Sequence, residues 1–436
     1  MLSSSPNNHP QTSLFDISSQ LDLNDPLLAL GRTIDWEGLE KAFSCFYSER
    51  GRAAKPIRLM CGLLLLKQLE NLSDESVIEQ WRRNPYYQVF CGEKQFQTTN
   101  PCHATELVKF RQRIGTDGVK YLFDSSIQIH GKAAQESTVL VDTTVQEKVI
   151  TYPTDSKLLI KIINRLNKLA KLHGVKQRRT FVKETKSLRL ACRHFRHVKR
   201  RRKAMKAIRR LRTIAGILMR ELKRKLPDSV IQEQAGNFVL YQRVIDQRRN
   251  DKNKVYSLHE SDVYCVAKGK DHKTYEYGRK ASIVSTKDSN IIVGVASHDI
   301  NEHDSKTLKA ALASAHEHRE KPIKLVVADR GYRGGKKYLD EGTELLLPSQ
   351  PLKRDSSYQR QKKRILCRRR AAIEPIIGHL KHDYRLSRNW LKGSQGDEIN
   401  LYMAACAWNM KKWMAAFFIY RKGSTMIAII LQITLD

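Results

Sequence analysis

The chain has 436 residues, of which 79 are Lys or Arg and 45 are Asp or Glu, so its formal net charge is +34. Because 41% of the residues are hydrophobic, the chain can form buried cores, and a wholly disordered protein is excluded. A surface this basic attracts polyanions, of which nucleic acid comes first and an anionic membrane second.

The apolar segments are too short to support the membrane alternative. The longest runs, residues 413–420 and 426–431, are separated by Arg421 and Lys422. Each is far shorter than the roughly 20 residues that a spanning helix needs. The first thirty residues also lack the basic and apolar regions of a secretory signal. We therefore expect a cytoplasmic, nucleoid-associated protein with no membrane partner.

The eight cysteines are scattered along the chain, with no two closer than eleven residues. Zinc sites and disulfide frameworks have closer and more regular spacings. Cys102 lies beside His103, but no further Cys or His follows at a suitable interval. Reduced, mostly buried thiols in a reducing compartment are the expected state.

The N-terminal part of the chain is expected to be helical. Residues 1–30 are rich in Ser, Asn and Pro and should form a flexible leader, and residues 31–130 a small all-α domain. Three helices are predicted there, over residues 58–69, 73–83 and 105–114. The last presents Lys109, Arg111 and Arg113, which favours a helix-turn-helix-type module that contacts DNA. The same composition also fits any small helical bundle.

The first predicted strand is residues 138–142, and residues 145–152 are able to pair with it. A strongly basic segment follows. Residues 157–225 hold 26 Lys or Arg and two acids, a net charge of +24. Apolar residues recur there with helical spacing, so we expect a helical insertion over 157–226 that packs on itself. The rest of its surface is available for phosphates, with the run Arg200, Arg201 and Arg202 as the strongest candidate.

After the insertion the sequence alternates between strands and helices up to about residue 420. The predicted elements are strands at 275–286 and 291–297, a helix at 304–317, strands at 323–328 and 345–347, and a helix at 365–385. With the first strand, this order is that of a ribonuclease-H-like α/β fold. We therefore expect a catalytic domain over 131–420, interrupted by the helical insertion, and an apolar tail over 421–436 whose role is unknown.

Three acidic residues stand where such a fold brings side chains together. Asp142 ends the first strand, Asp329 ends a later one, and Glu374 lies in the long terminal helix. Side chains at neighbouring strand ends converge at one edge of an open α/β sheet. Any one of these acids alone is more often a cap or a turn residue, and it is their joint placement that favours a site.

Converging carboxylates repel one another unless cations lie between them. Hard oxygen ligands select Mg²⁺ or Mn²⁺, and two such ions roughly 3.5–4 Å apart can activate a nucleophile and stabilise the leaving oxygen of a phosphoryl transfer. Basic residues nearby are suited to hold the phosphates. Arg370 and Lys381 flank Glu374 on its helix, and Lys280 lies on the second strand of the domain.

The stretches around these acids resemble the DDE transposases of bacterial insertion sequences, in the large group called insertion sequence family five. They read Leu-Val-Asp-Thr-Thr-Val at Asp142, Val-Ala-Asp-Arg-Gly-Tyr at Asp329, and Arg-Ala-Ala-Ile-Glu-Pro at Glu374. The family's third block is Tyr, two residues, Arg, three residues, Glu, six residues, Lys. Arg370, Glu374 and Lys381 keep that spacing, whereas Cys367 replaces the tyrosine.

The resemblance implies a Mg²⁺- or Mn²⁺-dependent transposase in which Asp142, Asp329 and Glu374 are catalytic and bind the metal. Such an enzyme binds the terminal inverted repeats of its element, hydrolyses phosphodiester bonds at the ends and joins the 3′-hydroxyl groups to target DNA. Double-stranded DNA is the implied partner, and a homodimer or higher oligomer on DNA the implied assembly. The alternatives are a catalytically decayed transposase that only binds DNA and a basic RNA-binding or structural protein.

Several other residues near the acids are weaker candidates for a site. Trp390 follows the predicted catalytic helix and is able to stack on an unpaired base, but packing in the core is the expected role. The nearby histidines are not needed, because a two-metal mechanism requires no protein base. They are His259, His298, His303 and His379.

Overall fold

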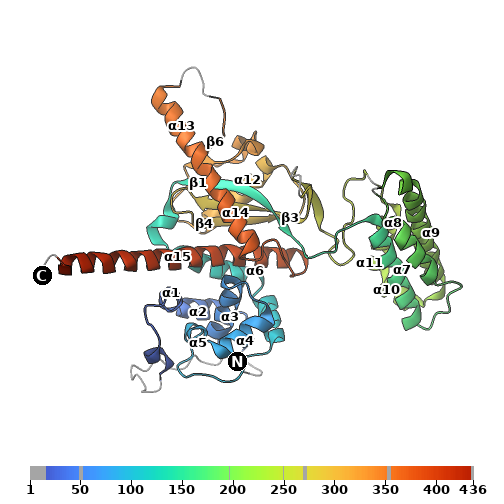
Figure 1. The fold of residues 1–436 in the computed structure, drawn as a ribbon, viewed down its shortest axis with the longest axis horizontal. Helices are drawn as coiled ribbons and strands as arrows, with labels where there is room; N and C mark the ends of the chain where they lie inside the picture. Colours follow the sequence, from blue (N-terminus) through green and yellow to red (C-terminus); the bar gives the residue numbers. More distant parts are fainter. Residues whose placement is uncertain are drawn as a thin grey trace. The chain divides into compact units, whose positions relative to one another are not determined.

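The computed structural model describes residues 16–48, 53–195, 197–248, 250–268, 273–350 and 355–433, with side chains up to residue 420 (Figure 1). The chain divides into two compact units. One contains the described residues up to Glu147 and from Arg279 onward, and the other is Lys148–Gly278. None of the helices in the described part combines the length and apolar character of a membrane-spanning segment.

Helices form the N-terminal part, as predicted, but they begin earlier than the sequence indicated. A 3-10 turn at Ile17–Gln20 and helix α1 at Pro26–Thr33 lie within the expected leader, where Asp25 caps α1. Residues 1–15 lie outside the described part of the chain. The following helices are α2 (Trp36–Ser44), α3 (Ile57–Leu69), α4 (Asp74–Arg83), α5 (Pro85–Phe90) and α6 (Ala104–Gln128).

Helix α3 is the centre of this part because it is apolar on nearly every side and is buried accordingly. Helix α6 starts with a capping box between His103 and Glu106 and is interrupted at Gly115, which has a φ of 56°. Glycine tolerates this left-handed conformation at little cost. The predicted helix 105–114 is therefore the first half of α6, and the second half leads to the sheet.

The sheet combines parallel and antiparallel pairs, which confirms the predicted mixed α/β class. Its strands are β1 (Thr138–Glu147), β2 (Tyr264–Ala267), β3 (Tyr275–Thr286), β4 (Ile292–His298), β5 (Leu325–Val327) and β6 (Glu344–Leu346). Strand β1 lies between β3 and β5, and β6 follows β5. The pairs β1–β5 and β5–β6 are parallel, and β3–β4 is antiparallel. Strand β2 pairs with the first residues of β3, within the second unit.

Strand β1 differs from the prediction of two short paired strands, because it is one strand of ten residues. Helix α12 (Asp304–Glu317) contacts β4, and α14 (Ile373–His382) contacts β1. The predicted helix 365–385 is divided into α13 (Ser357–Arg369), a 3-10 turn at Arg370–Ala372, and α14. The division places Pro375 in the first turn of α14, where its missing N–H breaks no helical hydrogen bond.

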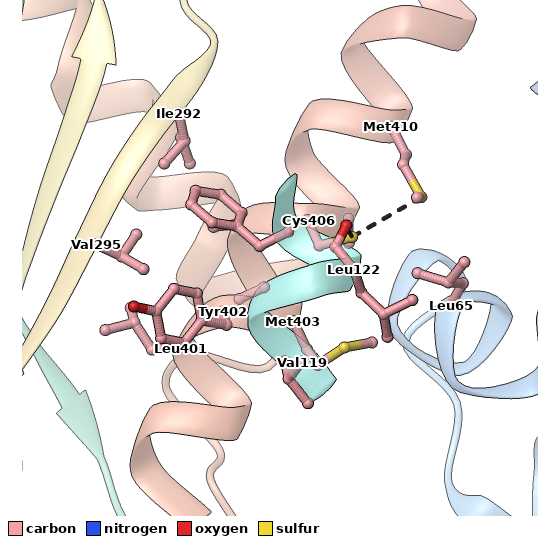
Figure 2. Packing of buried hydrophobic residues seen from close by; sticks show 14 of the residues in the cluster. Leu65, Val119, Leu122, Ile292, Val295, Leu401, Tyr402, Met403, Cys406 and Met410 are labelled. Carbon is pink, nitrogen blue, oxygen red and sulfur yellow. Dashed lines mark hydrogen bonds between the residues drawn. The ribbon is translucent and has the colours of Figure 1, made fainter. Parts of the chain in front are cut away.

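The long helix α15 (Gly393–Ile433) joins the N-terminal helices to the sheet. Its buried residues contact α3, α6 and β4. Figure 2 shows Leu401, Tyr402, Met403 and Cys406 of α15 among the side chains of these three elements. One continuous apolar core therefore holds the N-terminal helices and the sheet together. The backbone of the apolar tail continues this helix as far as Ile433, and the tail's side chains lie outside the described part.

The second unit contains the basic segment and is mainly helical, and we call it the helical insertion. Its helices are α7 (Asp155–Leu172), α8 (Val182–Cys192), α9 (Arg201–Lys225), α10 (Asp228–Glu233) and α11 (Ala235–Asp246), with a 3-10 turn at Val198–Arg200. The apolar stripes of α7 and α9 meet in a separate core, which confirms the predicted self-packing. The two acids of the basic segment form ion pairs, Glu184 with Arg210 at 2.6 Å and Glu221 with Lys225 at 2.7 Å.

Candidate active site

Asp142 and Asp329 lie at the same level of two neighbouring strands, Asp142 in the middle of β1 and Asp329 just beyond the end of β5. Strands β1 and β5 are parallel, and their register pairs Leu140 with Val327. Each aspartate lies two residues beyond its member of this pair. Their side chains are anchored by the local backbone, since Asp142 accepts a hydrogen bond from the Thr143 N–H at 2.7 Å and Asp329 one from the Gly331 N–H at 2.8 Å. The two carboxylates therefore lie at one level of adjacent strands. The prediction that Asp142 ends its strand is wrong, because β1 continues to Glu147.

Glu374 is linked to this pair through Arg370. The Arg370 guanidinium lies 3.0 Å from Glu374 Oε1 and 3.7 Å from Asp142 Oδ2. The arginine side chain is 18% exposed, whereas that of Glu374 is 60% exposed. Arg370 lies in the 3-10 turn before α14 and Glu374 in the first turn of that helix, so Arg370 connects Glu374 to Asp142 in the middle of β1.

A fourth carboxylate, Asp304 at the start of α12, lies at the same site, although the sequence indicated no role for it beyond the first residue of a helix. The cap of that helix is His303. Asp304 Oδ1 accepts hydrogen bonds from the Thr143 hydroxyl and from Lys280 Nζ, both at 2.9 Å. A spacing signal could not have found it, because its partners lie on β1 and β3, far away in the sequence.

Gly331 and Tyr332 follow Asp329 in the chain and lie next to the carboxylates of the site. A Cβ atom added to Gly331 would lie 2.9 Å from Asp329 Oδ1 and 3.1 Å from Asp304 Oδ2, so the glycine allows both carboxylates to approach. Tyr332 is fully buried beneath them. Its pKa is raised well above the ordinary value, first by burial and then by the negative charges of Asp142, Asp304 and Asp329.

The donor atoms of the site are carboxylate oxygens, which suit a hard divalent cation. Within the described part of the chain, no three His, Cys, Asp or Glu side chains are close enough together to bind one ion as a group. The pair Asp142 and Asp329 fits the first ligands of such a cation, since both stand at one level on adjacent strands. The third acid, Glu374, is held by Arg370 in this arrangement.

Two of the basic residues proposed to contact DNA have structural partners. Arg111 is 8% exposed and binds both carboxylate oxygens of Asp74, at 2.7 and 2.6 Å. Lys280 is buried against the Glu302 carbonyl and Asp304, so it positions Asp304. These contacts give both side chains a structural role that the sequence did not indicate, and their contact with phosphates stays a prediction. The sequence around Arg111 and Lys280 does not reveal that they are buried, because a basic residue in an amphipathic pattern is normally expected on the exposed face.

The remaining basic candidates keep surface that DNA can reach. Lys109 and Arg113 are exposed on α6, where the Arg113 guanidinium lies over the Tyr47 ring. Arg200, Arg201 and Arg202 are exposed at the start of α9, and Lys381 is half-buried in the last turn of α14. Their contacts with DNA stay predictions.

The four histidines near the acids in sequence all bond to close neighbours. The partners are Ser257 for His259, Ser282 for His298, Ser305 for His303 and Asp383 for His379. Burial lowers the pKa of His298. Cys367, which replaces the family tyrosine, is half-buried on α13, and burial raises the pKa of its thiol. These local contacts account for the histidines without a role in the chemistry.

Comparisons with known proteins identify two transposase domains in the chain. Residues 15–113 match a family described as a transposase domain (DUF772), and residues 254–410 match the transposase DDE domain. The second match includes Asp329 and Glu374 and begins after Asp142. An uncharacterized protein, ORF8 in the nfe locus of Rhizobium meliloti, is 40% identical over 178 residues, which cover 40% of this chain and 86% of that protein. No solved structure matches the chain.

The two matched domains place the chain in the class of DNA transposases. The chain belongs to the family of transposases that join the DUF772 and DDE domains, as insertion-sequence transposases do. The predicted family is thereby confirmed, and a transposition function follows from it.

Proposed function

We propose that this protein binds the terminal inverted repeats of an insertion sequence, hydrolyses phosphodiester bonds at its ends and joins the 3′-hydroxyl ends to target DNA. The observation that carries the proposal is the placement of Asp142 and Asp329 at one level of two parallel strands, with Arg370 between Asp142 and Glu374. Acids in that arrangement, within a DDE domain, serve phosphoryl transfer.

The core is inferred to be ribonuclease-H-like. Outside the helical insertion, the described strands and helices follow the predicted order: β1, β3, β4, α12, β5, β6, and then the helices that carry Glu374. The link between β5 and β6 is made of 3-10 turns rather than a full helix. This order supports the inference because it sets Asp142 on the central strand and Asp329 on its parallel neighbour.

Asp142, Asp329 and Glu374 are the residues that would hold Mg²⁺ or Mn²⁺. When bound, the ions supply charge neutralisation and an activated oxygen nucleophile. Other side chains of the protein position these acids and the DNA phosphates. Lys280 and Thr143 orient Asp304, whose carboxylate lies near that of Asp329 across Gly331. Arg370 is close enough to bind a phosphate oxygen once Glu374 turns away from it.

The helical insertion is proposed to hold DNA through its exposed basic face, with Arg200, Arg201 and Arg202 as phosphate contacts. In the first unit, Lys109, Arg113 and Lys381 are proposed for the same purpose. We further propose that the protein acts as a homodimer or higher oligomer on DNA, in the cytoplasm and associated with the nucleoid. Each of these statements follows from the family resemblance and the charge distribution.

The test is a Mg²⁺-dependent cleavage and strand-transfer assay on the DNA that flanks the gene, compared between wild type and Asp142→Asn, Asp329→Asn and Glu374→Gln. Loss of cutting and joining with retained DNA binding is expected for all three. An active Glu374→Gln protein would remove Glu374 from the site. An inactive wild type that still binds the repeats would favour the decayed transposase, an alternative that the replacement of the family tyrosine by Cys367 keeps open.

A further inference from the structure

A small basic recess lies where the N-terminal helices meet the loop after α14. Lys67 and Arg111 come from the helices, and Arg385, Arg388 and Trp390 come from the loop. The recess has a volume of about 40 Å³. A space of that size accepts a few waters or a phosphate-sized group, and it is too small for a nucleic acid base.

Positive charge exceeds negative charge around this basic recess. Asp74 binds both Lys67, at 2.9 Å, and Arg111, at 2.6 Å, so two cations share one carboxylate. Arg385 and Arg388 add two more positive charges from the loop. Burial, and after it the charge of Arg111, lowers the pKa of Lys67 to about 8, while Asp74 acts to raise it. An anion placed there would relieve their repulsion.

Trp390 is 70% exposed, which is contrary to the expected role in the core. The indole is therefore available to a ligand that also reaches the neighbouring cations. The loop is fixed by contacts that do not involve the indole. Asn389 donates to Asp397 at 2.6 Å and accepts from the Leu391 N–H at 2.9 Å, so the backbone is held on both sides of Trp390.

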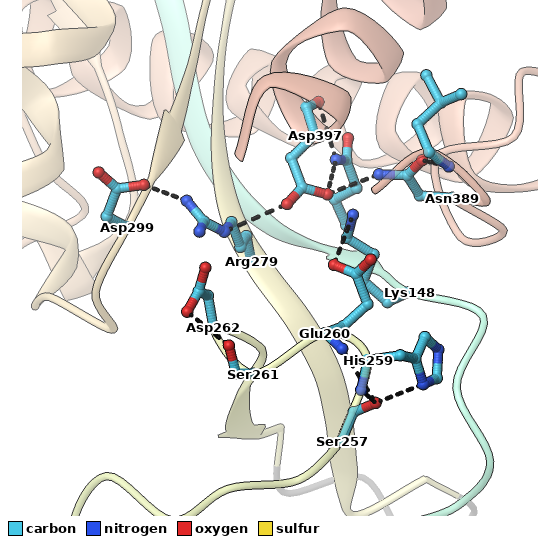
Figure 3. A network of polar contacts seen from close by, with 12 residues as sticks. Lys148, Ser257, His259, Glu260, Ser261, Asp262, Arg279, Asp299, Asn389 and Asp397 are labelled. Carbon is cyan, nitrogen blue, oxygen red and sulfur yellow. Dashed lines mark hydrogen bonds and ion pairs between the residues drawn. The ribbon is translucent and has the colours of Figure 1, made fainter. Parts of the chain in front are cut away.

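The support behind this loop is buried and polar. Figure 3 shows Asp397 receiving Asn389 and the guanidinium of Arg279. Gln146 of β1 also donates to Asp397, at 3.0 Å, and the Asn389 N–H donates to the Glu147 carbonyl at 3.1 Å. The network ties the loop to the strand that carries Asp142. The indole is therefore presented at a fixed place in the same domain as the acids.

We propose that the basic recess binds a DNA backbone phosphate and that Trp390 stacks on an unpaired base next to it. Aromatic side chains beside cations are the usual platform for unpaired bases. In a duplex both faces of each internal base are already covered, so the indole is able to stack only where pairing or stacking is interrupted. The inference rests on the proposed function, which produces such DNA at the ends of the element, and it names the DNA structure that the enzyme recognises.

The test measures DNA binding by fluorescence anisotropy in EDTA, so that no cleavage is required. The two probes are one duplex that is fully paired and the same duplex with a single unpaired 2-aminopurine. The wild type is expected to bind the second more tightly and to quench its fluorescence. Trp390→Ala should lose on the order of tenfold affinity for that probe alone, and Trp390→Phe should keep most of it.

Phe96→Ala is the matched control, because Phe96 is also a half-exposed aromatic residue, 49% exposed, and lies on the N-terminal domain. It should bind both probes as the wild type does. Arg388→Gln tests the phosphate contact, since it should weaken binding to both probes and lower the salt slope by about 0.9. Arg388 is exposed, so its substitution leaves the fold intact.

Equal binding of the two probes by the wild type, or unchanged preference in Trp390→Ala, would overturn the proposal and indicate that the exposed indole contacts another protein. The proposed function has an independent readout. Suppose that the preference for the unpaired base depends on Trp390 but neither the wild type nor any variant cleaves DNA in Mg²⁺. The base-binding site is then supported, and the catalytic role of the three acids is contradicted. If cleavage depends on the three acids but the preference is absent, the reverse holds.

Discussion

Thr143 donates a hydrogen bond of 2.9 Å to Asp304, a residue 161 positions further along the chain. The contact joins the residue after Asp142 to the first turn of α12. Lys280 binds the same Asp304 oxygen from β3. Three elements therefore meet on one carboxylate, and the position of Asp142 depends on a side chain that the motif of the family does not include.

Asp304→Asn is expected to lower the rate of DNA cleavage by roughly 10–100-fold, as substitutions of residues that orient metal ligands do. The amide keeps the size of the side chain but removes the charge that holds Lys280. DNA affinity in EDTA should stay unchanged. Glu317→Gln, at the exposed opposite end of α12, is the control and should cleave normally. A fully active Asp304→Asn protein would show that Asp304 serves only the fold.

Arg370→Ala is expected to lower both the Mg²⁺ concentration needed for half-maximal cleavage and the maximal rate of cleavage. The guanidinium lies within 3.7 Å of both Asp142 and Glu374, so it disfavours a second cation there. Without it, half-maximal cleavage should need several times less Mg²⁺, while the rate at saturation falls because the guanidinium no longer binds a phosphate oxygen. A Mg²⁺ titration of cleavage separates the two effects. If the titration midpoint does not move, Arg370 does not compete with the metal.

Neutralising the start of α9 tests the helical insertion. The double substitution Arg201→Gln with Arg202→Gln should reduce the slope of log affinity against log salt by about 0.9 for each phosphate that the two arginines bind. Lys306→Gln with Lys309→Gln, two exposed positions on α12, removes the same charge elsewhere and should change the slope less. Equal slopes for the two variants would contradict a DNA contact at the start of α9 and would favour a role of the helical insertion in protein–protein packing.

Asp74→Asn is expected to destabilise the N-terminal helices by about 3–5 kcal/mol, because it leaves Arg111 and Lys67 as buried cations without their carboxylate. Denaturant unfolding measures the change. Glu75→Gln, the exposed neighbour in the first turn of α4, should change stability little. A destabilisation as small for Asp74→Asn as for Glu75→Gln would mean that water reaches this ion pair.

The same aspartate sets a pH dependence. Burial acts to raise the pKa of Asp74, but hydrogen bonds and charges from Arg111 and Lys67 lower it to about 2, below its ordinary 3.8. A carboxylate with a lowered pKa contributes stability that is complete above about pH 4 and disappears as the pH falls toward 2. The stability difference between wild type and Asp74→Asn should therefore shrink over that interval. A constant difference from pH 6 to pH 2 would contradict the lowered pKa.

Much of the architecture could be predicted because it depends on patterns among residues that are close together in the sequence. The helical spacing of apolar residues in 157–225 predicted an insertion that packs on itself, and the strand ends at Asp142 and Asp329 predicted neighbouring carboxylates. The spacing of Arg370, Glu374 and Lys381 carried the family resemblance. Each of these features depends on residues close together in the chain, and hydrophobic period and motif spacing report such features directly.

The tertiary structure decided what depends on residues far apart. It placed Asp304 beside Asp329, buried Arg111 against Asp74 and Lys280 against Asp304, and left Trp390 open to solvent. In the sequence, a buried arginine and an exposed one look alike, because the partner that offsets the cost of burial lies on another element. The net charge of +34 thus indicated a polyanion, while only the packing of the chain determined which of its cations remain available to bind one.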